Sequence, residues 1–400
     1  MIPESVQRRA RWVLDTVGGR GLELGDDLPY DAAAWEQVAR GERPAGDDLA
    51  EAFFHLARIE ELSGRKDEHG RFAAASSCLD PLDPPLERLR RRLGLEPPSW
   101  RGARFAIALT HDVDVPWRWT GRAVRGTAAR LKAHALAGRR SAALREVRAL
   151  AGYPLHRLRG TDPNWRFEAI LEAERERDAS STFFVLAGHS DGHDGASPEM
   201  YDRLRPRLVE TILAHGGEVG LHGTYRASRD SALLGAEART LAALGAEVHG
   251  QRYHYLRVDP HSNLAPLPAL GLRYDTSLGF SDAAGFRAGI AQPFRPWDLE
   301  ADSALELVEI PLVAMDVTLG EDRYLGLSAR EAARPLLALL DFAAEQGGGF
   351  SVLWHTDRFD RATAQGWDEL YWRFLDAVRE RGGVCLSAGE LAAAADVWLG

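Results

Sequence analysis

Residues 104–114 have the sequence RFAIALTHDVD, and this stretch decides how the rest of the chain is interpreted. Residues 105–109 form an uninterrupted apolar run, and the polar residues that follow are typical of the end of a buried strand. If the chain stays extended over residues 110–114, Asp112 and Asp114 point to one side and His111 to the other. Two carboxylates on one side can divide the work of holding a metal and taking a proton. We therefore expect a site at the end of this strand.

Similar apolar runs recur along the chain, at residues 181–186, 218–221, 247–251, 272–278, 305–313, 350–354 and 384–386. Amphipathic helical stretches lie between most of them, at residues 165–177, 199–214, 229–244, 329–344 and 367–381. Strand–helix alternation over about 300 residues indicates an α/β protein with a parallel sheet. A sheet of this length favours a (β/α) barrel, distorted and with seven or eight strands. A doubly wound open sheet is the alternative, but no Gly-rich phosphate loop follows the first strand.

The chain divides into two regions by composition. Residues 1–100 are rich in Pro, Gly and Asp and are expected to form a small N-terminal accessory region, with residues 101–400 forming the barrel domain. Five prolines mark the boundary: Pro81, Pro84, Pro85, Pro97 and Pro98.

Residues 118–160 differ from the rest of the chain in charge. They contain 11 Lys and Arg residues and a single acidic residue, Glu146, whereas the whole chain has a net charge of −10. This stretch is predicted to be a basic helical insertion. Its positive face is either merely solvated or makes contact with an anionic membrane or a phosphorylated substrate.

Composition also excludes several classes of protein. The net charge of −10 argues against a general nucleic-acid binder. The two cysteines, Cys78 and Cys385, cannot form a disulfide framework and are expected to be reduced. Residues 1–19 lack the apolar core of a signal peptide, and no apolar run is long enough to span a membrane. These features predict a cytoplasmic location.

Several more polar residues occupy the ends of the expected strands: His222, Arg252, His254, Asp275 and His355. In a (β/α) barrel the carboxyl ends of the strands meet at one face, where the chemistry takes place. A divalent ion such as zinc takes a few His and Asp ligands and keeps one position open for water. A second carboxylate can then remove a proton from water, and an imidazole can protonate a leaving amine. The set therefore suits a metal-dependent hydrolase.

The motifs resemble those of the polysaccharide deacetylases (carbohydrate esterase family 4) over roughly residues 104–390. Thr110–Asp114 resembles the D-x-D form of the first motif, and His222 fits the start of the second, H-[ST]-x-x-H. Arg252–Tyr255 resembles R-x-P-[YF], with His254 in place of Pro, and Leu353–His355 resembles the closing L-x-H. Members of this branch also have an N-terminal segment like residues 53–72, which fits the accessory region.

The resemblance implies a role for each matching residue. Asp112 would be the catalytic base and Asp114 a metal ligand. Arg252 would orient the base, and the backbone N–H of Tyr255 would help to stabilise the oxyanion. His355 would be the general acid.

One ligand of the family is missing, because Arg226 stands where the second histidine of H-[ST]-x-x-H belongs. We expect His254 to replace it, so that Asp114, His222 and His254 hold a divalent metal, with zinc the leading choice. The alternative makes His111 the third ligand and His254 a substrate-binding residue.

Three residues are expected to bind substrate. Tyr255 can stack on a sugar ring. Asp275 and Arg287 belong to a stretch that related proteins use as a wall of the cleft. The predicted function is removal of an N-acetyl group from an amino sugar in a polysaccharide or its cytoplasmic precursor. The alternatives are hydrolysis of another amide or of a formyl group, and a degenerate member that binds glycans without turnover.

Overall fold

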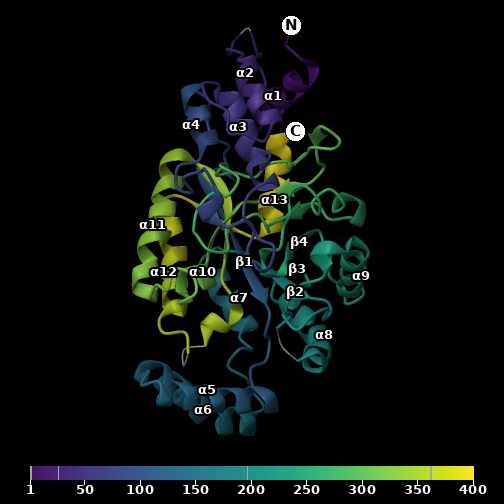
Figure 1. The fold of residues 1–400 in the computed structure, drawn as a ribbon. Helices are drawn as coiled ribbons and strands as arrows, with labels where there is room; N and C mark the ends of the chain where they lie inside the picture. The colour runs from purple at the N-terminus through teal and green to yellow at the C-terminus, as the bar shows by residue number, and fades with distance from the viewer. Residues whose placement is uncertain (1, 26, 196, 361–362) are drawn as a thin grey trace.

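The computed structural model describes residues 2–25, 27–195, 197–360 and 363–400. Within these residues nine strands form one sheet in which all neighbours are parallel (Figure 1). In spatial order they are β8 (Val308–Glu309), β5 (Tyr274–Asp275), β4 (Gly250–Tyr253), β3 (Glu218–Gly223), β2 (Thr182–Leu186), β1 (Phe105–Val113), β10 (Gly348–Leu353) and β9 (Leu312–Met315), with β11 (Val384–Leu386) also paired to β1. Each apolar run found in the sequence contributes to this sheet.

The sheet curls until its two ends meet. β8 and β9 stand at opposite ends of the strand order, yet only Ile310 and Pro311 separate them along the chain. An extended chain covers at most about 3.6 Å per residue, so the end of β8 must lie close to the start of β9. The Leu312 N–H also donates to the carbonyl of Leu278 at 3.3 Å. The fold is therefore a distorted (β/α) barrel, as the sequence predicts, and the doubly wound alternative is excluded.

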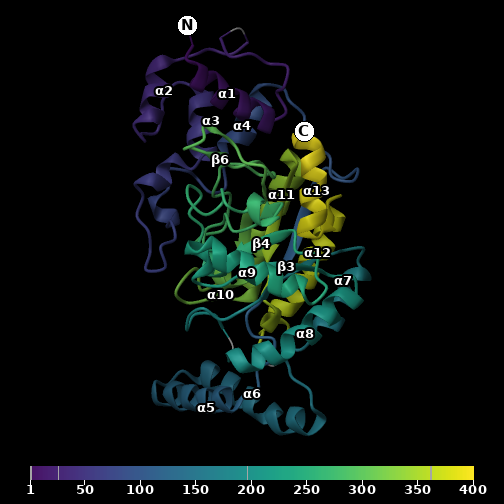
Figure 2. The same cartoon turned by 90° about the vertical axis from the view of Figure 1, so that its right-hand side faces the viewer.

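Helices surround the barrel (Figures 1 and 2). They are α7 (Phe167–Arg175), α8 (Pro198–Ala214), α9 (Ser231–Ala242), α10 (Asp316–Gly320), α11 (Ala329–Gln346), α12 (Trp367–Glu380) and α13 (Ala388–Leu399). Local sequence fixes where some of them begin: Ser328 and Glu331 form a capping box at the start of α11, and Ser387 and Glu390 do so for α13. Their buried faces are apolar, in line with the 3.6-residue periodicity of the sequence.

The N-terminal region lies across one end of the barrel (Figure 1). It contains α1 (Glu4–Thr16), α2 (Ala32–Ala39), α3 (Asp48–Leu56) and α4 (Pro85–Arg92). Trp12 and Phe53 pack on Trp297, which begins the small hairpin of β6 (Trp297–Asp298) and β7 (Ser303–Ala304). Apolar side chains of this region and of the barrel form one continuous core. Burial of that shared surface fixes the N-terminal region on the barrel.

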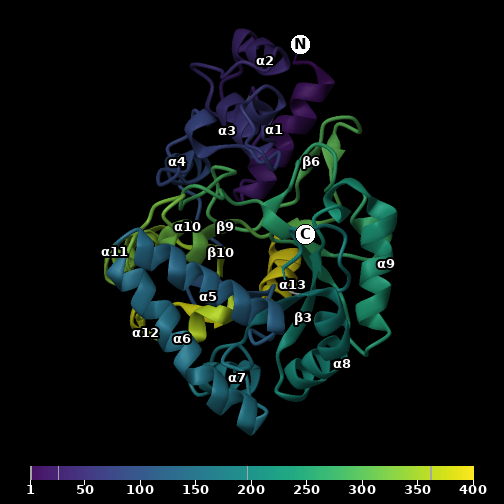
Figure 3. The same ribbon diagram turned by 60° about the horizontal axis from the view of Figure 1, so that its bottom comes forward.

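The basic stretch forms two helices that stand away from the barrel (Figures 1 and 2) and come to the front of it when the molecule is tilted (Figure 3). They are α5 (Gly121–Leu136) and α6 (Arg140–Arg159), which pack against each other and are called the basic hairpin below. The hairpin follows the carboxyl end of β1 and so lies at the end of the barrel opposite α1–α4. Across the described parts of the chain, no helix combines the length and the apolar character that crossing a bilayer requires.

Candidate active site

Strand β1 places its polar residues on two sides. Asp112 and Asp114 face the mouth of the barrel. His111, one residue away from each, is fully buried on the other side: its Nδ1 donates to the carbonyl of Trp354 at 2.7 Å, and its Nε2 lies 3.0 Å from Oε1 of Glu174. Both ring nitrogens are therefore engaged within the core, and His111 cannot be the third metal ligand.

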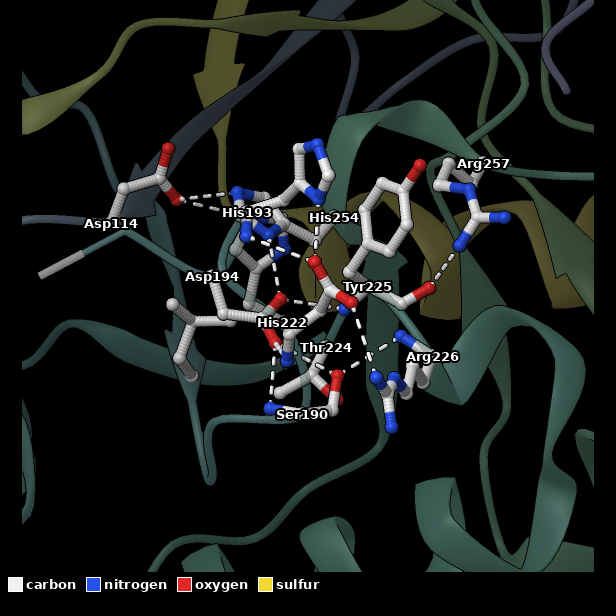
Figure 4. Close-up of polar contacts among 12 residues, drawn as sticks. Asp114, Ser190, His193, Asp194, His222, Thr224, Tyr225, Arg226, His254 and Arg257 are labelled. Carbon is white, nitrogen blue, oxygen red and sulfur yellow. Dashed lines mark hydrogen bonds and ion pairs between the residues drawn. The ribbon is translucent and has the colours of Figure 1, made fainter. Parts of the chain in front are cut away.

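Asp114, His222 and His254 meet at one point at the mouth of the barrel (Figure 4). Oδ1 of Asp114 lies 3.3 Å from Nε2 of His222 and 3.5 Å from Nε2 of His254. All three donor atoms lie within 4.8 Å of one another. Oδ1 of Asp114 and Nε2 of His222 are buried and make no hydrogen bond. A shared cation would satisfy both atoms.

Both imidazoles are held so that the same nitrogen faces this point. Nδ1 of His222 donates to the carbonyl of Arg252 at 2.9 Å, and Nδ1 of His254 donates to Oδ1 of Asp194 at 3.0 Å. An acceptor at Nδ1 fixes the tautomer and leaves Nε2 as the metal-binding atom, which is the usual arrangement around histidine ligands. Three protein donors with room for water match a catalytic zinc site. The residues present therefore fit a divalent metal.

Asp194 has a structural role that the sequence did not reveal. It is almost fully buried and accepts hydrogen bonds from the Tyr225 N–H, from Ser190 and from His254. Burial opposes its ionisation, but these hydrogen bonds hold the pKa of Asp194 below its usual value. Asp194 therefore orients the imidazole of His254.

Gly195 lets this loop approach the site. Its φ is +75°, and a Cβ there would lie 2.5 Å from the backbone oxygen of Asp114. Only glycine avoids both the strained backbone and the clash. Arg226, at the position of the missing histidine, is exposed and lies 3.4 Å from Asp191, away from the metal-binding point.

Arg252 orients Asp112 from within the barrel. Its Nη1 donates to Oδ1 of Asp112 and to Oγ1 of Thr110, each at 2.9 Å. The guanidinium is fully buried and lies over the ring of Phe184 at 4.6 Å. The pairing engages one oxygen of Asp112 and leaves Oδ2 free of Arg252.

His355 lies across the pocket from the two histidines. Its Nε2 lies 3.8 Å from Oδ2 of Asp114, and its Nδ1 donates to Oδ1 of Asp316 at 2.7 Å. Burial disfavours protonation of His355, but Asp316, Asp114 and Asp112 overcome this effect and raise its pKa to about 10. Arg358 pairs with the other oxygen of Asp316 at 2.8 Å.

Asp316 is a functional candidate that sequence analysis missed. Asp316 directly follows β9, so the pattern of polar residues at strand ends would have found it.

The pocket in front of these residues includes a contribution from the N-terminal region. Arg71 of the N-terminal region lines the pocket, together with Tyr255, Arg323 and Tyr324 of the barrel domain. Tyr255 has a φ of +63°, which is rare for a residue with a side chain, and Nη1 of Arg71 donates to its carbonyl at 3.3 Å. The N-terminal region thus helps to hold a strained backbone segment at the mouth of the pocket.

The structure corrects two of the predicted substrate-binding residues. Asp275 is fully buried and accepts hydrogen bonds from the N–H and the hydroxyl of Ser277. Arg287 is buried against Glu61 and donates to the carbonyl of Gly279. Neither lines the pocket, so neither can contact a substrate there. Tyr255 does line it.

Strand register explains the position of Asp275. It lies level with Gln251 of β4, one residue before Arg252. Successive side chains along a strand point to opposite faces, so Arg252 points to Asp112 and Asp275 points away.

A second group of metal-type donors lies in the N-terminal region: His55, Glu60 and Cys78. His55 is buried and neither ring nitrogen has a hydrogen-bond partner. However, Glu60 already accepts from Arg58, from Ser77 and from the N–H of Cys78. Because Glu60 already accepts these hydrogen bonds and lies beside the buried guanidinium of Arg58, this group is a poor cation site. We therefore favour the group at the barrel mouth.

No family model matches the sequence, and no curated protein matches it. Among solved structures, a probable polysaccharide deacetylase from Pseudomonas aeruginosa PAO1 is 16% identical, with a TM-score of 0.48 over 74% of this chain and 94% of that one. The allantoinase PuuE is 15% identical, with a TM-score of 0.48 over 80% of this chain and 98% of that one. Likenesses this distant carry no inference about activity.

Glu237 of α9, which lies in the wall beside His222, is expected to make the stability of the fold depend on pH. Its carboxyl bonds the hydroxyl of Thr224 and accepts from the Thr224 N–H at 3.1 Å. Burial raises the pKa of Glu237 from its usual 4.5 to about 7. The contribution of Glu237 to the free energy of unfolding is therefore fully present below pH 4.5 and is lost as the pH rises through 7. We expect Glu237→Gln to stabilise the fold by roughly 1–3 kcal/mol at pH 8 and by much less at pH 5, measured by urea unfolding. Equal effects at both pH values would contradict this account.

Proposed function

We propose that this protein is a metal-dependent hydrolase that removes an N-acetyl group from an amino sugar in a polysaccharide or its precursor. The observation that carries the proposal is the meeting of Asp114, His222 and His254 beside Asp112, with His355 across the pocket. A metal site, a clamped carboxylate and an opposing imidazole are the parts that amide hydrolysis needs.

Asp114, His222 and His254 would hold the metal, with zinc the leading choice. When bound, a divalent ion supplies Lewis acidity, which makes water a nucleophile at neutral pH and polarises an acyl carbonyl. Asp194 and the carbonyl of Arg252 keep the two imidazoles turned toward it.

The remaining residues handle protons. Arg252 fixes Asp112 through Oδ1, so that Oδ2 can accept the proton of the attacking water. His355 carries a proton for the leaving amine, and Asp316 orients its ring by accepting from Nδ1. The two groups approach from different strands, β1 and β10, so each can act on its own side of the amide.

The residues that line the pocket are the reason for proposing a sugar as the substrate. Tyr255 offers a ring that can pack on a pyranose face, and Arg71, Arg323 and Tyr324 add hydrogen-bond donors around it. Aromatic stacking with a few placed polar groups is a common way to hold a polar ring.

A panel of amides tests the proposal. Zinc-loaded protein is expected to release acetate from N-acetylated amino sugars faster than it hydrolyses N-formyl compounds or cyclic amides. Faster turnover of a formyl compound or a cyclic amide would keep the hydrolase but reject the acetyl substrate. If no amide is hydrolysed while N-acetylated glycans still bind, the protein binds glycans but does not hydrolyse them.

A further inference from the structure

Helix α6 carries an apolar stripe that nothing in the described part of the protein covers. Its large members are Leu144, Val147, Leu155 and Leu158, with Ala151 between them, and all are exposed. Spacings of three and four residues place them on one face of the helix. Of ten exposed large hydrophobic side chains among the described residues, these four and Leu136 of α5 lie in the basic hairpin.

The stripe is not needed to hold the hairpin together. The opposite face of α6 does that: Ala142 and Ala149 are buried there, and Glu146 pairs with Arg130 of α5 at 2.9 Å. These positions are also three and four residues apart, half a turn from the stripe. α6 therefore has two faces with apolar side chains. One packs on α5, and the other, the stripe, is exposed.

Positive charge surrounds the free face. Arg148 and Arg159 are exposed and follow Leu144 and Leu155 by four residues, so they flank the stripe. Residues 118–160 carry a net charge of +10 in a chain whose total is −10. An apolar stripe bordered by arginine is suited to an interface with negative charge above an apolar interior.

We propose that the basic hairpin docks on an anionic lipid bilayer, with the α6 stripe entering the headgroup boundary and the flanking arginines contacting lipid phosphates. Pairing with a second copy through the same face would bring two +10 surfaces together, which is unfavourable. Nucleic acid would satisfy the arginines but leave the leucines exposed to water. The proposal does not depend on the hydrolase activity.

The test is flotation of the full chain with lipid vesicles. Binding to vesicles of equal parts phosphatidylcholine and phosphatidylglycerol should exceed binding to phosphatidylcholine alone by at least about tenfold, and should weaken with salt. Leu155→Asp with Leu158→Asp should reduce binding about tenfold or more, as should Arg148→Glu with Arg159→Glu.

Matched controls lie at the opposite end of the barrel. Val397 in α13 is 84% exposed, as is Leu158, and Arg379 is exposed in the last turn of α12. Val397→Asp and Arg379→Glu should leave vesicle binding unchanged, and circular dichroism should show that every variant is folded. Equal binding to both vesicle types, or equal loss in the control variants, would overturn the proposal. So would a dimer by light scattering that the Leu155→Asp and Leu158→Asp changes convert to monomer.

Discussion

Asp112→Asn is expected to lower kcat/KM for acetate release from an N-acetylated amino sugar by about 10²- to 10⁴-fold. The amide keeps the shape of the carboxylate and can still accept from Arg252 through its oxygen, but it cannot take a proton from water. Because Asp112 is not among the three proposed ligands, the variant should retain its metal. Steady-state kinetics and metal analysis of the same preparation measure both quantities.

Asp357→Asn is the matched control. Asp357 also lines the pocket, two residues after His355, yet it is Asp316 that bonds the His355 imidazole. We expect Asp357→Asn to change kcat/KM by no more than a few-fold. If Asp112→Asn retains most of its activity, or loses its metal, then Asp112 is not the base.

His254→Ala is expected to weaken zinc binding by more than about 100-fold. Loss of an outer partner of a metal ligand typically costs 10- to 100-fold, and loss of a ligand should cost more. The prediction separates this chain from the family it resembles, in which a proline occupies the corresponding position. Equilibrium dialysis with zinc and a competing chelator measures the affinity.

His111→Gln is the control for that experiment. His111 lies in β1 next to Asp112, but it is buried between Trp354 and Glu174, and a glutamine can still donate to Glu174. It should bind zinc as the unaltered protein does, even if it is less stable. Undiminished zinc affinity in His254→Ala would reject His254 as a ligand, and loss of zinc in His111→Gln would restore the alternative.

Much of the fold follows from the sequence because parallel strands buried on both faces are continuous apolar runs. The runs at residues 105–109, 181–186 and 350–354 each became a strand of the barrel. Packing of the N-terminal region was not predictable, since it depends on contacts such as Trp12 with Trp297, far apart in sequence. No local pattern encodes a contact of that kind.

The site was only partly predictable for a related reason. Polar residues at strand ends pointed to Asp114, His222 and His254, because these ends meet at one face. The same pattern included Asp275, which the register turns to the other face of the sheet. Asp194 lies in a loop, and its contact with His254 depends on how that loop folds back. Strand periodicity carries no information about loops.

Zinc titration of chelator-treated protein tests the central claim most directly, with bound metal and acetate release measured on the same samples. The proposed site predicts that one zinc ion binds per chain and that acetate release from an N-acetylated amino sugar rises from near zero to a plateau as that ion binds. Acetate release that is unchanged by removal of the metal, or a chain that binds no zinc, would contradict the account.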